Sequence, residues 1–142
     1  MTITISKIGL IITTIGSIML IISGIYELFG IDWGLMGSIS AQSPFGYFLT
    51  FLVILAPILL GVAPFSTGAA GAFNNDKIGV ILSLLFSCVA LIGGFIPLTL
   101  YGYSTLLCGS FFHLTFNGIW INYDAIIMII GAIINTIGVF KD

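Results

Sequence analysis

The chain has 142 residues, of which 59% are hydrophobic and only 6% are charged. A soluble domain carries about 25% charged residues, so this sequence cannot cover a water-exposed surface and is expected to be a single-domain integral membrane protein. The net charge of −2, with three lysines and no arginine, provides no basic patch for nucleic acid, and the sequence lacks the phosphate-loop, dinucleotide, HExxH and CxxC motifs.

Four apolar stretches, separated by charged or turn-forming residues, predict an all-α membrane fold with four transmembrane helices and short loops. The first span covers about residues 8–26, between Lys7 and Glu27. At about 1.5 Å per residue, its length approaches the hydrocarbon thickness of about 30 Å. Because this run is longer than the apolar region of a signal peptide, which has about 7–15 residues, we expect a retained helix.

The second predicted span covers about residues 45–65. Pro44 suits the start of a helix, and Pro57 is expected to kink the middle because proline removes a helix amide. The following segment, 66–75, is rich in small and turn-forming residues and therefore predicts a loop.

The third predicted span covers about residues 78–101 and the fourth about 124–140. Residues 74–76 offer N-cap candidates for the third helix, and Asp124 is the candidate for the fourth. With Asp124 counted as a cap, no Asp, Glu, Lys, Arg or His lies within a predicted span. A proton pump, a voltage sensor or an ion-coupled carrier needs such groups, so these functions are disfavoured.

The four-span arrangement gathers the basic residues on one side of the membrane: Lys7, Lys77 and Lys141. The acidic residues Glu27, Asp32 and Asp124 fall on the opposite side, so the positive-inside rule predicts that both termini are cytoplasmic. The isoleucine-rich, arginine-free composition favours a prokaryotic source, and we expect the protein to lie in the plasma membrane.

Small residues recur at helical spacing on three of the predicted spans, where they let helix backbones approach closely. We expect these positions to pack helices together, within the chain or against another subunit: Gly9, Gly16, Ser23, Gly79, Ser83, Ser87, Gly131, Asn135 and Gly138. Asn135 is the most polar side chain within a span. Such a residue can mark a substrate path, but an interhelical hydrogen bond is the expectation here, with a contribution of about 1 kcal/mol.

The exterior segment 111–123 alternates apolar and polar residues on either side of Asn117-Gly118, which is the strongest short signal for a β-hairpin turn. Folding at this turn places six apolar side chains on one face, which we expect to be buried against the bundle or a neighbouring subunit: Phe112, Leu114, Phe116, Ile119, Ile121 and Tyr123. His113 and Asn122 fall opposite one another on the other face. The alternative is an amphipathic re-entrant or interfacial segment, because the stretch is rich in aromatic residues.

The exterior side combines carboxylates with the single imidazole, a set that could hold a divalent metal: Glu27, Asp32, His113 and Asp124. These residues come from three separate segments and nothing in their spacing enforces convergence, so we expect no metal site. Cys108 and His113 have no evident orienting group, so we expect no nucleophilic catalysis. Cys88 lies in mid-helix and Cys108 outside the spans, and both are expected to be free thiols.

No catalytic residues and no cofactor are therefore assigned, and the expected partners are membrane lipids and other membrane subunits. The sequence favours a non-catalytic accessory or structural subunit of a larger membrane complex, such as a respiratory or redox assembly. The alternative is a self-assembling homo-oligomeric membrane protein, such as an array, a pore for neutral solutes or a viral envelope protein.

Overall fold

The computed structural model describes residues 4–30, 44–95, 97–100, 103–106, 112–117 and 119–141, and these form four helices and two β-hairpins. The helices are α1 (Ile5–Gly30), α3 (Pro44–Asn74), α4 (Lys77–Gly93) and α5 (Tyr123–Lys141). Strand β1 (Pro97–Leu100) pairs with β2 (Tyr103–Leu106), and β3 (His113–Phe116) pairs with β4 (Ile119–Asn122).

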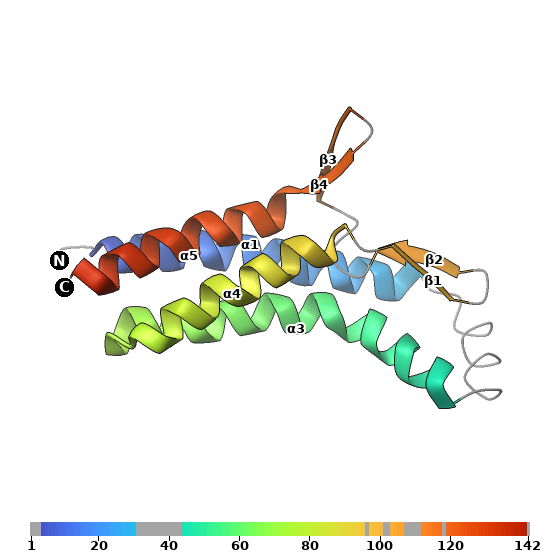
Figure 1. Ribbon diagram of the computed structural model, residues 1–142, viewed down its shortest axis with the longest axis horizontal. Helices are drawn as coiled ribbons and strands as arrows, with labels where there is room; N and C mark the ends of the chain where they lie inside the picture. Colours follow the sequence, from blue (N-terminus) through green and yellow to red (C-terminus); the bar gives the residue numbers. More distant parts are fainter. Residues whose placement is uncertain are drawn as a thin grey trace.

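The four helices lie along one long axis, with both chain termini at one end and both hairpins at the other (Figure 1). We call these the terminal end and the hairpin end of the bundle. Helix α1 packs on α5 and α3, and α4 packs on the other sides of α3 and α5. Helices α3 and α5 also contact one another directly, and the small and polar residues of all four helices meet in the interior.

Three of the helices are long and apolar enough to cross a membrane: Ile5–Tyr26 of α1, Leu55–Asn74 of α3, and Tyr123–Lys141 of α5. Helix α4 is apolar but has only 17 residues, or about 25 Å at 1.5 Å per residue. The expectation of a helical membrane protein is therefore supported for three spans. A fourth crossing by α4 stays a prediction, because the helix is shorter than a typical hydrocarbon core of about 30 Å.

Helix α3 continues through the segment 66–75 as far as Asn74, so the predicted loop is wrong. The hydroxyl groups of Ser66 and Thr67 donate hydrogen bonds to carbonyl oxygens one turn earlier, which keeps these residues compatible with a helix. The glycines of this segment do not form turns. Gly71 instead lies so close to Val80 that a side chain there would collide with α4.

Helix α4 ends at Gly93, so the predicted extension of this span to residue 101 is also wrong. Gly93 and Gly94 both favour termination, and Pro97 cannot continue a helix because it lacks an amide hydrogen. Residues 97–100 instead form β1, which pairs with β2 in a hairpin that the sequence pattern did not indicate.

Two of the predicted local features are confirmed. Asp76 caps α4, because its Oδ1 accepts a hydrogen bond of 3.0 Å from the amide of Ile78. Figure 1 shows α3 as bent, and both Pro57 and Pro64 lie inside this helix, where each removes one hydrogen bond from the helical ladder.

The β3–β4 hairpin has the predicted register. Leu114 pairs with Ile121 and Phe116 with Ile119. Asn117 has a φ of 53°, which is the left-handed conformation that the Asn-Gly turn requires. The sequence therefore specifies this hairpin correctly, because a shift by one residue would mix the apolar and polar faces.

Candidate functional site

The contact between α1 and α5 depends on glycines that bring the two backbones together. A Cβ atom on Gly9 would lie 2.6 Å from the carbonyl oxygen of Gly131, and one on Gly16 would lie 2.7 Å from the carbonyl oxygen of Asp124. Gly138 makes the same kind of close contact with the start of α1. These predicted packing residues therefore all lie within the chain's own bundle, at positions where no side chain fits.

The same side of α1 also buries hydroxyl groups. Ser23, the third residue of the predicted stripe, is fully buried, and so is Thr13, whose Oγ1 donates to the carbonyl oxygen of Gly9 at 3.0 Å. Ser17 is almost fully buried, and its Oγ has no hydrogen-bond partner among the described residues. The interior of the bundle thus combines small polar groups with a few larger apolar side chains, among them Leu20, Met128 and Val80.

The predicted stripe on α4 packs against α3. A Cβ atom on Gly79 would lie 2.8 Å from the carbonyl oxygen of Thr67, and the Oγ of Ser83 donates a 2.8 Å hydrogen bond to the carbonyl oxygen of Pro64. Ser87 is fully buried and donates to the carbonyl oxygen of Ser83, also at 2.8 Å. This stripe is therefore occupied by a neighbouring helix of the same chain.

Asn135 makes the expected interhelical hydrogen bond. Its side chain is fully buried, and its Nδ2 donates to the carbonyl oxygen of Gly68 at 3.0 Å, which links α5 to α3 across the bundle. Its Oδ1 accepts no hydrogen bond from the described residues. Because Gly68 also lies close to Ser83, these three residues form a small polar cluster between three helices.

We expect Asn135→Ala to lower the free energy of unfolding by about 1–2 kcal/mol, because it removes one buried hydrogen bond between helices. Thr136→Ala is the matched control, since the Thr136 hydroxyl donates only to Ala132 within its own helix. Thermal or denaturant unfolding in detergent measures both variants. Equal stability of the two would mean that the bond to Gly68 contributes nothing to packing.

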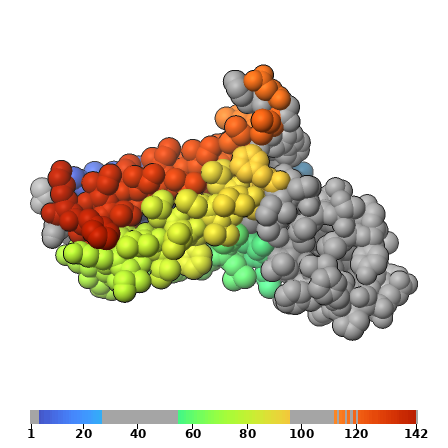
Figure 2. All heavy atoms as spheres, viewed as in Figure 1, coloured from blue at the N-terminus to red at the C-terminus, as the bar shows by residue number. Residues whose placement is uncertain are grey.

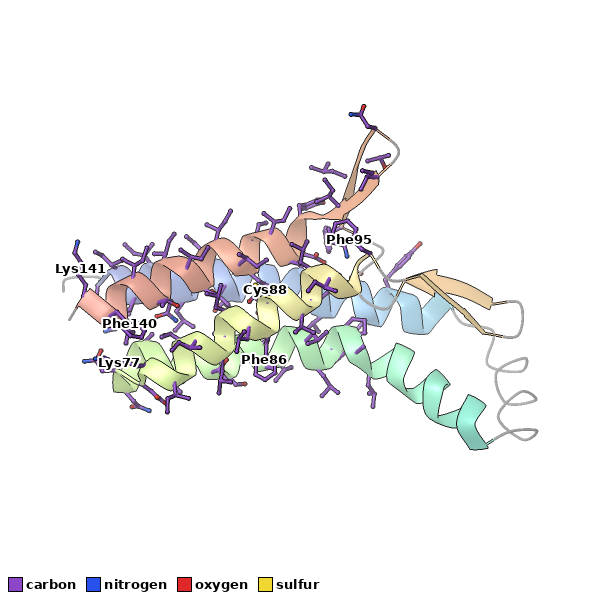
Figure 3. All side chains as sticks on the ribbon, viewed as in Figure 1. Lys77, Phe86, Cys88, Phe95, Phe140 and Lys141 are labelled. Carbon is purple, nitrogen blue, oxygen red and sulfur yellow. The ribbon has the colours of Figure 1, made fainter. Side chains whose placement is uncertain are left out.

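All three lysines lie at the terminal end of the bundle. The Nζ of Lys7 is 5.8 Å from the centroid of the Phe73 ring, and the Nζ of Lys77 is 5.4 Å from that of Phe140. Figure 3 shows Lys77 and Lys141 together at this end, with Phe95 at the hairpin end. The predicted gathering of basic residues at one end is therefore present in the fold.

The predicted exterior face on the β3–β4 hairpin is only partly covered. The hairpin projects away from the helices (Figures 1 and 2), and Leu114 and Ile119 remain 61% and 56% exposed. Ile121 is half-buried, and the rings of Phe112 and Tyr123 contact edge to face, with centroids 5.9 Å apart. Burial of the whole face against the chain's own bundle is therefore wrong for Leu114 and Ile119, and burial against another subunit stays a prediction.

The hairpin is held at its base by its polar face. Asn122 is buried, and its Nδ2 lies so close to Gly94 at the end of α4 that any side chain at Gly94 would collide with it. The polar side of the hairpin base is thus turned towards the bundle at Asn122. The side chains of its partner His113 and of Phe116 lie outside the described part of the structure.

Asp124 is fully buried, and it is not the N-cap of α5, because the helix already begins at Tyr123. Its Oδ1 accepts a 2.6 Å hydrogen bond from the amide of Ala125, whereas its Oδ2 has no partner among the described residues. A signal for this burial exists in the sequence: Asp124, Gly131 and Gly138 share a seven-residue spacing and hence one helix face.

Within the described part of the chain, no three His, Cys, Asp or Glu side chains come together as metal ligands. Of the residues weighed from the sequence, Asp32 and Cys108 lie outside the described residues, as does the side chain of Glu27. Cys88 is half-buried in α4 as a free thiol.

Comparisons of the chain with protein-family models, with curated proteins and with solved structures found no match in any of the three.

Proposed function

We propose that the chain is a non-catalytic structural subunit of a larger membrane protein complex, and that the β3–β4 hairpin docks on another subunit. The observation that carries this proposal is the exposure of Leu114 and Ile119 on a hairpin that extends beyond the bundle (Figure 2). An isolated two-stranded hairpin is only marginally stable in water, so its apolar face needs a covering surface.

Hydrogen bonding favours protein over lipid as that surface. The sheet of β3 and β4 has two strands, so the outward-facing N–H and C=O groups of each strand are not paired within the sheet. Hydrocarbon cannot satisfy such groups, which is why open sheet edges do not occur against lipid tails. A protein surface can supply both apolar contact and hydrogen bonds to the strands.

The packing inside the helix bundle also supports the proposal. The small-residue stripes make contacts within the chain, at Gly9, Gly16, Gly79, Gly131 and Gly138. The interior therefore serves to hold the chain's own helices together, and the surface is the part left to contact partners. The exposed helix faces are aliphatic, as expected of surfaces that meet lipids or other spans.

The orientation belongs to the same proposal. We place the terminal end, with Lys7, Lys77 and Lys141, on the cytoplasmic side of a prokaryotic plasma membrane, because the positive-inside rule favours that side for all three lysines. The hairpin then meets its partner on the exterior side. The respiratory or redox setting stays a prediction.

Purification from membranes in a mild detergent, followed by identification of the co-purifying polypeptides, tests the proposal. We expect distinct partner proteins in a fixed ratio to this chain. A particle that contains only copies of this chain would contradict it and would support the self-assembling array, pore or envelope protein instead.

The double variant Leu114→Asn and Ile119→Asn is expected to lose its partner while still inserting into the membrane. Each buried aliphatic side chain contributes about 1.5–3 kcal/mol, so the loss of one weakens binding at least about tenfold. Thr115→Asn is the matched control, because Thr115 is an exposed residue of the same hairpin and already polar. Retention of the partner by the double variant would show that another surface holds the complex together.

A further inference from the structure

A carboxyl group is enclosed by protein at the hairpin end of the bundle. Asp124 is fully buried in the first turn of α5, with Oδ1 bonded to the amide of Ala125 and Oδ2 unpartnered among the described residues. Its backbone carbonyl lies against Gly16 of α1. The residue is therefore covered by the chain itself, and neither water nor lipid reaches it in this arrangement.

The described side chains packed around this turn carry no charge. Leu20 of α1 and Ala90 of α4 form the adjoining core with Ala125 and Met128. Among nearby titratable side chains that are described, Tyr123 is half-buried beside Asp124, Tyr26 is exposed in α1, and Cys88 is half-buried in α4.

No lysine compensates this carboxyl group. All three lysines lie at the terminal end, and the sequence has no arginine. The remaining candidate cation is His113 on β3, and the remaining nearby acid is Glu27 in the last turn of α1. The side chains of both lie outside the described residues, and His113 therefore needs a direct test.

An ionised carboxylate in this position would lose its hydration without gaining a cation or a full set of donors. The start of α5 offers partial positive charge and one amide bond, which favour the ionised form. Burial of an unpaired charge costs far more than these contacts supply, whereas a neutral carboxyl group is much cheaper to bury. We propose that Asp124 is a proton-binding site, and that its carboxyl group carries a proton while the bundle is closed around it.

The position of this site couples the proton to the hairpin. Asn122 and Asp124, which flank Tyr123 where β4 meets α5, are both buried and fix the base of the hairpin to the helices. Release of the proton requires hydration of Asp124 and hence an opening of this junction. Because the closed state binds one more proton than the opened state, raising the pH favours opening.

Infrared spectroscopy of the full chain in lipid nanodiscs tests the site. We expect wild type at mildly acidic pH to show the carbonyl stretch of a protonated carboxyl group, shifted by exchange into deuterated water. This band should be absent in Asp124→Asn and present in Asp76→Asn, since Asp76 is exposed at the terminal end. A wild-type spectrum without the band would overturn the proposal, and this result does not depend on how any variant folds.

Two control experiments distinguish a bound proton at Asp124 from a metal cation or a histidine counter-ion. If sodium chloride removes the band at constant pH and choline chloride does not, the site binds a metal cation in preference to a proton, and the proposal fails. If the band appears only in His113→Gln, then His113 is the counter-ion of an ionised Asp124, and the proposal again fails. We expect neither change.

We also expect amide exchange at residues 119–125 to rise with pH, beyond its intrinsic increase, in wild type but not in Asp124→Asn.

Discussion

Gly9→Val is expected to separate α1 from α5 and to lower the free energy of unfolding by about 3 kcal/mol, at the upper end of the cost of overpacking a core. A Cβ atom at this position would lie 2.6 Å from the carbonyl oxygen of Gly131 and 2.7 Å from the Cα of Asn135. Both obstacles are backbone atoms, so no side-chain rotation can relieve the collision. Valine also adds two methyl groups beyond this Cβ.

The matched control is Ile11→Val, two residues away on the exposed side of α1, where the isoleucine is 54% exposed. It changes an aliphatic side chain without touching α5 and should leave the unfolding free energy within about 0.5 kcal/mol of wild type. Thermal unfolding in detergent, followed by circular dichroism, measures both. Unfolding of Gly9→Val at the temperature of the control would show that α1 and α5 do not pack through this glycine.

Ser83→Leu should destabilise the contact between α3 and α4 by about 2–3 kcal/mol. The change removes the 2.8 Å hydrogen bond to the carbonyl oxygen of Pro64. It also forces a larger side chain towards Gly68, which lies so close that a Cβ atom added to this glycine would be 3.1 Å from the Ser83 Oγ. Ser83→Ala separates the two causes, because it removes the hydrogen bond without adding bulk.

Leu85→Phe is the control for bulk on the same helix, since Leu85 is 55% exposed and a larger side chain there meets no other helix. Limited proteolysis at the turn between α3 and α4, together with thermal unfolding, reports on this pair of helices. A Ser83→Leu protein that resists protease as well as the control would mean that α4 can shift to accept the larger residue.

The features that the sequence predicts well are those fixed by strong local chemistry. Asn117-Gly118 determines the turn, and the alternation on either side determines the register of β3 and β4. Asp76 before an apolar run predicts the cap of α4. The long uncharged runs predict α1 and α5 because few residues in them interrupt a helix.

The incorrect predictions come from glycines and from an acidic residue whose role depends on tertiary contacts. Gly68 and Gly71 suggest a loop when the local sequence is considered alone. They lie within α3 instead, where the absence of a side chain lets α4 and α5 approach the helix backbone. Asp124 looks like a cap because it follows polar residues, and only the packing of α1 against α5 reveals that it is buried. Helix periodicity indicates the face of such residues, but the neighbouring helix determines what they contact.

The exposure of the β3–β4 hairpin is likewise a tertiary property. The sequence defines the apolar face, but the direction in which the hairpin leaves the bundle depends on how Asn122 fits against Gly94. That contact turns the polar base of the hairpin towards the helices and leaves Leu114 and Ile119 largely exposed. The proposed docking surface follows from this geometry rather than from hydrophobicity alone.

A photoreactive amino acid at position 114, activated in native membranes, tests the central claim most directly. The account predicts a covalent adduct between this chain and a different polypeptide, and a weaker one when the probe is placed at Thr115 on the opposite face. Adducts with lipid alone, or only with a second copy of this chain, would contradict the proposal that the hairpin docks this protein onto another membrane subunit.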